Sequence, residues 1–470
     1  MYGVLDYQGL RQTVKNIFTP NISILAISSF LVITTSGLFK SAMELEDAEQ
    51  AYYSQWWRLG YDDQPPLYTW LQIAFNKVLG STVLSFTMLR GLIFALTLWF
   101  CHRFAKEYLK QVDKANIAVF LLALVPVFID FAFRRLSHTT LLCLIVLFTY
   151  WAILKLISKK STYHYLLFGI AVGLGLLTKY NFLLVPLALL LAVPFSKSLQ
   201  SIVLTPTILI SVAIAVIICI PHYLWLYTHS AFLVELQNSI YQKTESLENS
   251  NSFFAFLALL KSFSSLVMPL AVFFVLGWVF KVIKFERPNK KDWLFKMLLA
   301  QFAILVAAAL FFGGQKFETR WLLPLFLPFM VYLVKLLRFT STAKPSRYLY
   351  FFFLLIVFFQ LVRTPAEKVF GMKSSVHYSF KPLSEKLKKS YPESQWILPD
   401  VTYAGEIRYH AQPKEVYFFN DYTLPKNEID SSRAIFIFKE GDLPLEKLSL
   451  TDSLPAFGED EINLYFYQQK

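Results

Sequence analysis

The sequence predicts a polytopic α-helical membrane protein with a small soluble α/β domain at its C-terminal end. The chain of 470 residues is 56% hydrophobic and 16% charged, whereas charged residues make up about a quarter of a typical soluble domain. Apolar runs of about 18 or more residues, enough to cross a bilayer as a helix, recur along most of the chain. After residue 363 the apolar runs shorten to the length of strands.

The predicted membrane-spanning helices number about eleven. The first follows Arg11 and Lys15, but it is long and lacks a small-residue cleavage pattern, so we interpret it as a retained helix and not as a signal peptide. The segments are 22–39, 83–101, 115–130, 138–157, 164–178, 181–195, 202–225, 254–281, 293–313, 321–338 and 347–363.

The basic residues predict how these helices are oriented. If the N-terminus is cytoplasmic, nearly all clusters of Lys and Arg fall in connections on the cytoplasmic side, as the positive-inside rule requires. The net charge of +13 is then explained by these loops, and nucleic acid is not expected as a partner. The opposite, extracytoplasmic face receives loop 40–66, the turn at 130–138, loops 228–252 and 313–320, and the C-terminal segment.

The segment 364–470 predicts a separate extracytoplasmic α/β domain beside the transmembrane domain 1–363. Strand-like apolar runs occur at 395–398, 416–419, 434–438 and 464–467, with a helical pattern at 383–389. The three cysteines, Cys101, Cys143 and Cys219, lie in or beside apolar segments without metal-ligand spacing. They are expected to pack in the interior.

The first outer loop, 40–66, concentrates carboxylates and aromatic side chains. This mixture favours amphipathic helix at the membrane surface, where Trp and Tyr prefer to lie. A carboxylate there is partly removed from water, which can adjust its pKa for general-base catalysis. A merely solvated acidic loop is the alternative. The acids are Glu44, Glu46, Asp47, Glu49, Asp62 and Asp63, and the aromatic residues are Tyr52, Tyr53, Trp56, Trp57 and Tyr61.

The second outer turn contains Arg134, Arg135 and His138. Arginines on this face depart from the positive-inside bias. Binding of a phosphate would explain them, because the guanidinium group matches phosphate oxygens. A structural salt bridge with Asp130 or with the acidic loop explains them equally well. His138 is either a proton carrier or a hydrogen-bonded structural residue.

Three further polar residues fall on the same face. Lys179 lies between two apolar segments with almost no loop around it, so it either serves a functional site or extends its amine to the membrane surface. His222 lies near an outer helix end and is either structural or functional. Arg320 either binds phosphate or pairs with Glu318.

Together these loops predict one active-site cavity on the outer face. The sequence has no Walker glycine loop, Rossmann fingerprint, Gly-x-Ser-x-Gly elbow or His-Glu-x-x-His motif. A nucleotide cofactor is therefore not expected. The paired acids could hold a divalent cation, but no ligand spacing demands a metal.

The first-loop pattern resembles that of bacterial membrane glycosyltransferases of the GT-C class. The resemblance rests on Tyr52-Tyr53, Gly60-Tyr61-Asp62 and Pro65-Pro66-Leu67, with later landmarks at 173–180, 221–225 and 320–324. The class includes protein O-mannosyltransferases, in the dolichyl-phosphate-mannose-protein mannosyltransferase superfamily, and the aminoarabinose transferase of lipid A. The resemblance covers about residues 20–363.

This resemblance implies a sugar transferase in the bacterial cytoplasmic (inner) membrane. It implies a polyprenyl-phosphate sugar donor and a glycolipid, glycan or protein acceptor in the envelope, with membrane lipids around the enzyme. A first-loop Asp would be the base, here Asp47, with Glu49 as its competitor. Lys179, Arg320 and either Arg134 or Arg135 would bind the donor phosphate, and direct displacement would invert the sugar.

The expected substrate-binding residues are Tyr52, Tyr53, Tyr61, His138 and His222. His138 stands where many relatives have Asp, which leaves the role of the second loop open. The alternatives to a transferase are a flippase or transporter of a lipid-linked sugar, and an O-antigen polymerase or ligase. A transporter would need polar residues at mid-membrane depth, and most of the predicted helices have no central charge.

Overall fold

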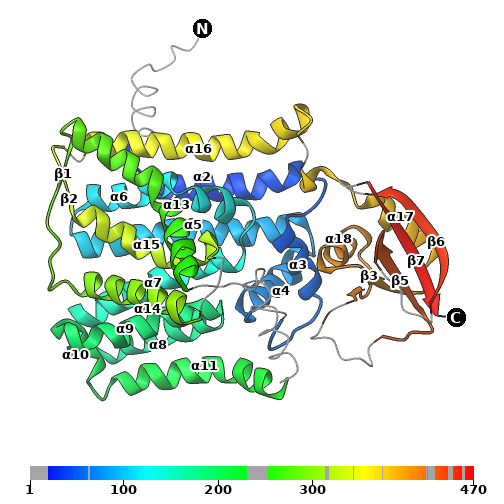
Figure 1. Ribbon diagram of the computed structural model, residues 1–470, viewed down its shortest axis with the longest axis horizontal. Coiled ribbons are helices and arrows are strands. Elements are labelled where there is room, and N and C mark those ends of the chain that lie inside the picture. The colour runs from blue at the N-terminus through cyan, green and yellow to red at the C-terminus, as the bar shows by residue number, and fades with distance from the viewer. Residues whose placement is uncertain are drawn as a thin grey trace, which may run out of the picture.

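The computed structural model describes residues 19–61, 64–229, 252–312, 317–341, 343–372, 374–419, 421, 429–442, 448–457 and 461–469. Long helices lie side by side in a bundle, and a five-stranded sheet lies beyond one of its ends (Figure 1). Asp62, Asp63, most of loop 228–252 and residues 313–316 lie outside the described residues.

The helical part contains at least one helix or helical turn within each predicted membrane segment. In chain order the elements are α2 (Ile22–Ser36), η1 (Gly37–Phe39), α3 (Leu45–Tyr53), α4 (Leu67–Leu79), α5 (Val83–Leu109), α6 (Val112–Phe120), η2 (Leu121–Leu124), η3 (Phe128–Ala132), α7 (His138–Ser158), α8 (Thr162–Leu176), η4 (Tyr180–Leu183), α9 (Leu184–Ala192), η5 (Val193–Phe195), α10 (Lys197–Val203), α11 (Ile208–Thr228), α13 (Ser252–Val279), β1 (Ile283–Phe285), α14 (Trp293–Phe312), α15 (Thr319–Lys335), β2 (Leu337–Phe339) and α16 (Ala343–Val369).

The predicted count of about eleven spans is not confirmed. Among the described residues, seven helices are long and apolar enough to cross a membrane, or eight if the pair bent by 117° around Ser196 is one span. The other predicted spans are short or broken. Helix α8 has 15 residues and α15 has 17, and segment 115–130 divides into α6, the 3₁₀ turn η2 and the π-helical turn η3.

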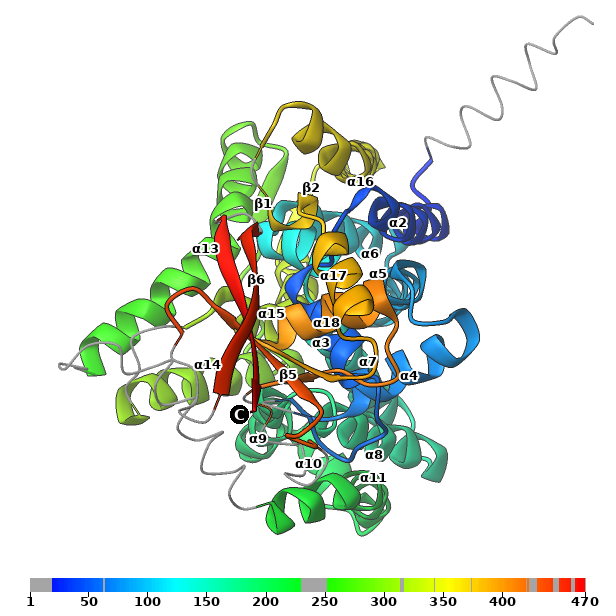
Figure 2. The same cartoon turned by 90° about the vertical axis from the view of Figure 1, so that its right-hand side faces the viewer.

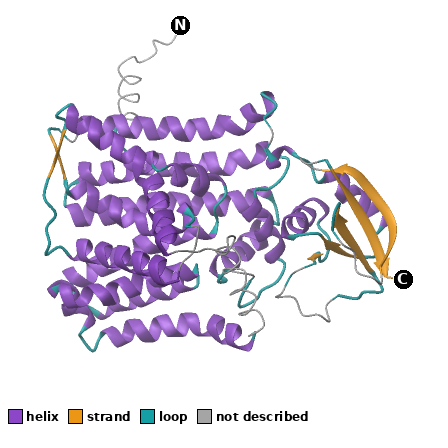
Figure 3. Cartoon of the chain, in the orientation of Figure 1, coloured by secondary structure: helices purple, strands orange, loops and turns teal. Residues whose placement is uncertain are grey.

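The C-terminal segment forms a mixed sheet covered by two helices. Figure 3 shows the strands of this sheet gathered beyond one end of the helical bundle. Strand order is β4-β3-β5-β7-β6, with β3 parallel to β4 and β5 and the remaining pairs antiparallel. The elements are η6 (Ser375–His377), α17 (Lys381–Ser390), β3 (Gln395–Leu398), α18 (Val401–Ala411), β4 (Tyr417–Phe418), β5 (Ala434–Lys439), β6 (Leu448–Phe457) and β7 (Ile462–Gln469).

The four predicted strand runs correspond to β3, β4, β5 and β7. The division between two domains at residue 363 stays a prediction, because α16 continues to Val369.

The helix α3 lies between the bundle and the C-terminal segment. Figures 1 and 2 both show α18 against α3, and a Cβ at Gly405 of α18 would come within 1.9 Å of the Ala48 carbonyl oxygen. Only glycine permits so close an approach of the two backbones. The buried carboxylate of Glu406 also accepts a hydrogen bond from the Met43 backbone N–H. The predicted first-loop helix and the residues just before it thus contact α18 of the C-terminal segment.

Candidate functional site

A polar cavity of about 420 Å³ opens where α3 meets the segment before α7 and the start of α15. Three chain segments that are far apart in sequence contribute to it. Its lining consists of Glu44, Leu45, Glu46, Val127, Arg135, Leu136, Glu318, Thr319 and Arg320. The π-helical turn η3 lies in the second of these segments, and such turns are often found at functional sites.

Glu46 is the first-loop acid that is best placed for chemistry. One carboxylate oxygen, Oε2, accepts hydrogen bonds from the backbone N–H and the hydroxyl of Ser137, at 2.5 and 2.7 Å. The other oxygen, Oε1, lies 3.9 Å from Nη1 of Arg320. The two Ser137 bonds fix the orientation of the carboxylate, so Oε1 is the oxygen that remains for a substrate in the cavity.

Two arginines from other segments line the same cavity as this carboxylate. The side chains of Arg135 and Arg320 are both 44% exposed, so each guanidinium reaches solvent in the cavity. Nε of Arg135 lies 3.4 Å from Oε2 of Glu44. A planar guanidinium group can bind two phosphate oxygens at once. In this cavity the Glu46 carboxylate can therefore accept a proton while the two arginines bind an anion.

Glu44 holds the basic residues around the cavity in place. Its carboxylate lies 3.0 Å from Lys40, 3.4 Å from Arg134 and 3.4 Å from Arg135. Burial acts to raise the pKa of Glu44, but the three cations outweigh this effect and leave the pKa below its usual range. Glu44 is thus expected to stay ionised and to act as a structural anion.

Asp47, the predicted base, lies in a different environment. Its side chain is buried and forms an ion pair with Arg90 of α5, which also donates to the Arg134 carbonyl oxygen. Burial raises the pKa of Asp47, while Arg90 and Lys40 act in the opposite direction. Asp47 does not line the cavity. Its contacts suit a structural ion pair better than proton transfer.

Glu49 and His138 are two predicted site residues that do not line the cavity. Glu49 is half-buried on α3 and is not part of the cavity lining. His138 is buried, with Nε2 3.1 Å from the Gln50 amide nitrogen. The Gln50 side-chain oxygen in turn accepts from the Thr69 hydroxyl at 2.9 Å. These contacts favour the interpretation of His138 as a hydrogen-bonded structural residue.

Lys179 lies close to the site without lining the cavity. Its amine donates to the Thr139 hydroxyl at 3.3 Å, on the first turn of α7, and Thr139 is two residues from Ser137. The arrangement keeps a cation near the polar cavity. It agrees with both of the roles that the sequence left open.

The three predicted substrate tyrosines are buried instead. Tyr52, Tyr53 and Tyr61 are 0%, 4% and 2% exposed and belong to a hydrophobic cluster shared with the C-terminal segment. The Tyr52 hydroxyl donates to Asp421 at 2.7 Å, and its ring meets Phe418 edge-on. Aromatic rings attach the first loop to the sheet, which sequence spacing alone does not reveal. Their predicted contact with substrate has no support from this geometry.

Two further predicted residues make structural contacts. Nδ1 of His222 lies 2.7 Å from the Leu59 carbonyl oxygen, and its Nε2 lies 3.3 Å from the Tyr180 hydroxyl. Arg134 is buried between Glu44 and Glu367, at 3.4 and 3.5 Å. The salt-bridge alternative therefore describes Arg134, and it also fits Arg135, which pairs with Glu44 but lines the cavity as well. Among the described residues, no three His, Cys, Asp or Glu side chains are grouped to hold a metal ion.

Three important residues were not singled out from the sequence. The role of Glu46 depends on how α3 is oriented about its own axis, and the role of Ser137 depends on its position before α7. Neither property has a clear signal in the sequence. Arg90 did have one, because it is a lone charge within an apolar segment. An ionisable residue in such a segment is a functional or structural site by default.

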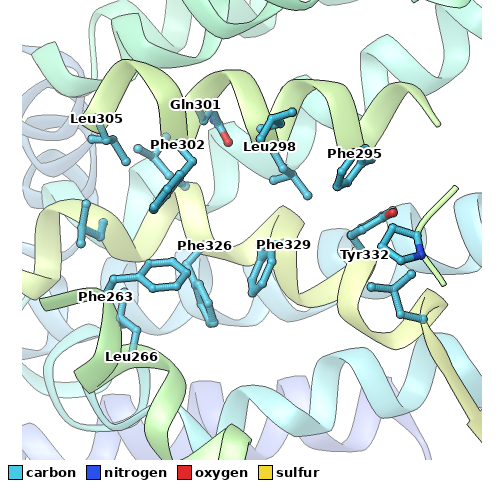
Figure 4. A pocket seen from close by; sticks show the side chains of 15 residues that line it. Phe263, Leu266, Phe295, Leu298, Gln301, Phe302, Leu305, Phe326, Phe329 and Tyr332 are labelled. Atoms are coloured by element: carbon cyan, nitrogen blue, oxygen red, sulfur yellow. The ribbon is translucent and has the colours of Figure 1, made fainter. Parts of the chain in front are cut away.

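An apolar pocket of about 370 Å³ extends along α15 beyond the polar cavity. Figure 4 shows Phe326, Phe329 and Tyr332 facing Phe295, Leu298 and Phe302 of α14 across this pocket. Thr319, which lines the polar cavity, is followed at helical spacing by Leu322, Phe326 and Phe329. One face of α15 therefore leads from the polar cavity into the apolar pocket.

Comparison with known proteins yields one family and several relatives. Residues 63–225 match the family model described as dolichyl-phosphate-mannose-protein mannosyltransferase. The lipopolysaccharide core galacturonosyltransferase RgtA of Rhizobium johnstonii is 28% identical over 331 residues, which cover 69% of this chain and 65% of the relative. The lipid A galacturonosyltransferase RgtD of the same organism is 24% identical, covering 53% and 52%. The chain thus spans less than two thirds of either relative's length.

The fold also matches a solved structure. The crystal structure of ArnT from Cupriavidus metallidurans, bound to undecaprenyl phosphate, superposes with a TM-score of 0.61 over 94% of this chain and 97% of that chain. The sequence identity is 11%. The two proteins thus share their fold over nearly their full length.

Proposed function

Given that this chain belongs to the GT-C class of membrane glycosyltransferases, we propose that it transfers a sugar from a polyprenyl-phosphate donor to a glycolipid of the cell envelope. One observation carries the proposal: Glu46 and two exposed arginines line a polar cavity, and the face of α15 that contributes Thr319 to this cavity also lines an apolar pocket. This arrangement suits a donor with an anionic head and a hydrocarbon tail.

The proposed reaction is a single displacement at the anomeric carbon. Oε1 of Glu46 takes the proton of the acceptor hydroxyl, and the acceptor oxygen attacks the anomeric carbon. The bond from that carbon to the phosphate oxygen breaks, and polyprenyl phosphate leaves with the electron pair. A single displacement inverts the configuration of the sugar. Asp47 and Glu49 remain the alternative bases, both farther from the cavity than Glu46.

The leaving phosphate is proposed to bind Arg135 and Arg320. Both guanidinium groups reach the cavity, and the developing negative charge on the phosphate is stabilised where donors already point at it. Lys179 is a third candidate, since its amine donates a hydrogen bond to Thr139 on the first turn of α7. A divalent cation could also stabilise the leaving phosphate, but the proposed displacement does not require one.

The polyprenyl tail is proposed to follow α15 into the apolar pocket. Thr319 and Leu322 lie one turn apart on the same helix face, so a lipid with its phosphate at Arg320 meets apolar side chains directly below. Aliphatic chains bind such surfaces through loss of water-exposed apolar area. If the phosphate binds at Arg320, the apolar pocket along α15 is therefore the expected site for the tail.

The relatives suggest the first substrates to test. Their names describe galacturonosyl transfer to a lipopolysaccharide core and to lipid A, and the neighbouring fold holds undecaprenyl phosphate. We therefore propose a uronic acid as the sugar and a lipid A-core glycolipid as the acceptor. The site would face the periplasm of the inner membrane, as the distribution of basic residues predicts.

The deciding experiment is a transfer assay with the purified full chain. Undecaprenyl phosphate carrying radiolabelled galacturonic acid is supplied with and without lipid A-core acceptor. The expected result is labelled glycolipid together with an equal amount of free undecaprenyl phosphate. Movement of intact donor across a proteoliposome bilayer without its consumption would instead favour a transporter, and incorporation into a glycan polymer would favour a polymerase.

A further inference from the structure

A buried arginine of α5 connects the segment that carries the proposed base to the segment that carries a phosphate-binding arginine. The Arg90 side chain is 1% exposed. Its guanidinium group pairs with Asp47 on α3 and donates a hydrogen bond to the Arg134 carbonyl oxygen. Asp47 is next to Glu46 in the chain, and Arg134 is next to Arg135. Arg90 does not line the cavity, so it can influence the proposed reaction only through these neighbours.

The hydrogen bond from Arg90 to the turn at 130–138 is made to the backbone. The same stretch of backbone carries Arg135 into the cavity lining and presents the Ser137 N–H group to the Glu46 carboxylate. Glu44, just before α3, joins the same two segments, but through the side chains of arginines. Arg90 thus holds the main chain of this turn, and with it Arg135 and Ser137, in place relative to α3.

Helix α5 is a firm support for this side chain. Gly91, the neighbour of Arg90, faces α2, where an added Cβ would come within 3.1 Å of the Phe30 carbonyl oxygen. One turn earlier, the Thr87 hydroxyl lies 3.3 Å from the Thr34 carbonyl oxygen of α2. The absence of a side chain at glycine allows the two helices to pack this closely. The base of the Arg90 side chain is therefore fixed by contacts outside the candidate site.

We infer that Arg90 is a positioning residue that sets the separation between Glu46 and Arg135. The inference rests on the proposed function, since both of these groups act in the proposed sugar transfer. A planar guanidinium group carries its donors in a rigid fork, so it holds two acceptors at a set distance from each other. A misplacement of about 1 Å, even from a change far from the chemistry, can cost about 10²-fold in rate. Arg90 therefore contributes to the rate of transfer without touching the substrate.

The first test measures backbone hydrogen exchange in the purified full chain by mass spectrometry. Arg90→Lys keeps a positive charge beside Asp47, but its amine ends one bond short of the two guanidinium nitrogens that reach the acceptors. The Ser137 amide should then exchange about tenfold faster, the effect of losing a hydrogen bond to a charged group. Amides in the middle of α7 should exchange as in the wild type. Unchanged exchange at Ser137, or an equal increase throughout the protein, would overturn the inference.

The second test measures sugar transfer per folded molecule in the same variant. We expect kcat to fall by about 10²-fold, while KM for the donor changes much less because Arg320 and the apolar pocket belong to other elements. A wild-type kcat in Arg90→Lys would overturn the positioning role. An inactive wild-type protein would instead refute the proposed sugar transfer, and exchange at Ser137 would still decide whether Arg90 holds the two segments together.

Two further variants separate positioning from general loss of stability. Glu107→Gln/Lys155→Met removes an ion pair of 2.6 Å between α5 and α7, about 25 Å along the helix from Arg90. This control should keep wild-type kcat and wild-type exchange at Ser137, and equal changes in it would overturn the inference. If Arg90→Lys does not fold, Asp47→Leu/Arg90→Met removes both buried charges. Faster exchange at Ser137 in that variant supports the inference, and wild-type exchange there contradicts it.

Discussion

Helix α3 carries two adjacent acids in opposite environments. Glu46 lies at a polar cavity beside Arg320, with two hydrogen bonds from Ser137. Asp47 is buried against Arg90 of α5. Successive residues on a helix point about 100° apart, and that rotation separates an acid that can reach a substrate from one that joins two helices.

The comparison shows why a count of acids does not identify a base. A catalytic base must lie within hydrogen-bond reach of the proton that it removes. A buried, paired carboxylate instead contributes to stability, because removal of one partner leaves an uncompensated charge. Substitution of the two acids should therefore affect different quantities: the rate of transfer for Glu46 and the stability for Asp47.

The largest effect is expected for Glu46→Gln. The amide cannot accept the acceptor's proton, and general-base catalysis contributes about 10²- to 10⁴-fold, so kcat should fall by about that factor. Transfer assays in detergent would measure kcat, and the melting temperature should be nearly unchanged. Glu49→Gln is the matched control on the same helix and should retain most activity. Full activity in Glu46→Gln would exclude this assignment of the base.

Asp47→Asn should instead lower stability. It leaves Arg90 buried without a countercharge, which costs about 3–5 kcal/mol in the free energy of unfolding, and thermal unfolding in detergent would detect this loss. The second variant Asp47→Leu/Arg90→Met removes both charges and should recover much of the stability. If kcat per folded molecule fell in Asp47→Asn while the melting temperature held, Asp47 would be the base after all.

A smaller effect is expected from narrowing the apolar pocket. Leu298→Trp adds volume among the side chains of Figure 4 and should raise KM for a long-chain polyprenyl donor by about tenfold, or about 1.4 kcal/mol. KM for a donor with a short prenyl chain should not change. Leu310→Trp is the control, since Leu310 is on α14 and 43% exposed. An equal rise for both donors would place the tail elsewhere.

The smallest effect is expected for Glu406 of α18, which accepts a hydrogen bond from the Met43 backbone N–H just before α3. Burial raises the pKa of Glu406 above its usual range, with His410 acting in the opposite direction. Its contribution to stability is therefore full below the ordinary carboxyl pKa and is lost as pH rises through the raised value. Melting temperatures across that range should fall for the wild type and change less for Glu406→Gln. Glu393→Gln, at an exposed position, should follow the wild-type profile.

Much of the architecture follows from the sequence because it depends on local composition. Long apolar runs predicted the membrane helices, and four short ones predicted β3, β4, β5 and β7. Strand β6 was missed because Asp452 and Pro455 interrupt its pattern, which an edge strand tolerates. Helix α18 was also missed, although Asp400 accepts hydrogen bonds from the Thr402 and Tyr403 backbone N–H groups as an N-cap.

The sequence by itself determined that this is a membrane protein with an acidic, aromatic first loop, and that the loop resembles a sugar transferase. Hydrophobicity and residue type are local properties, so they can be read without a fold. The tertiary structure decided that Glu46 and not Asp47 meets the cavity, that Arg135 reaches it while Arg134 is buried, and that Tyr52 packs against the sheet. These outcomes depend on helix rotation and on partners dozens to hundreds of residues away, such as Arg90, Glu367 and Phe418.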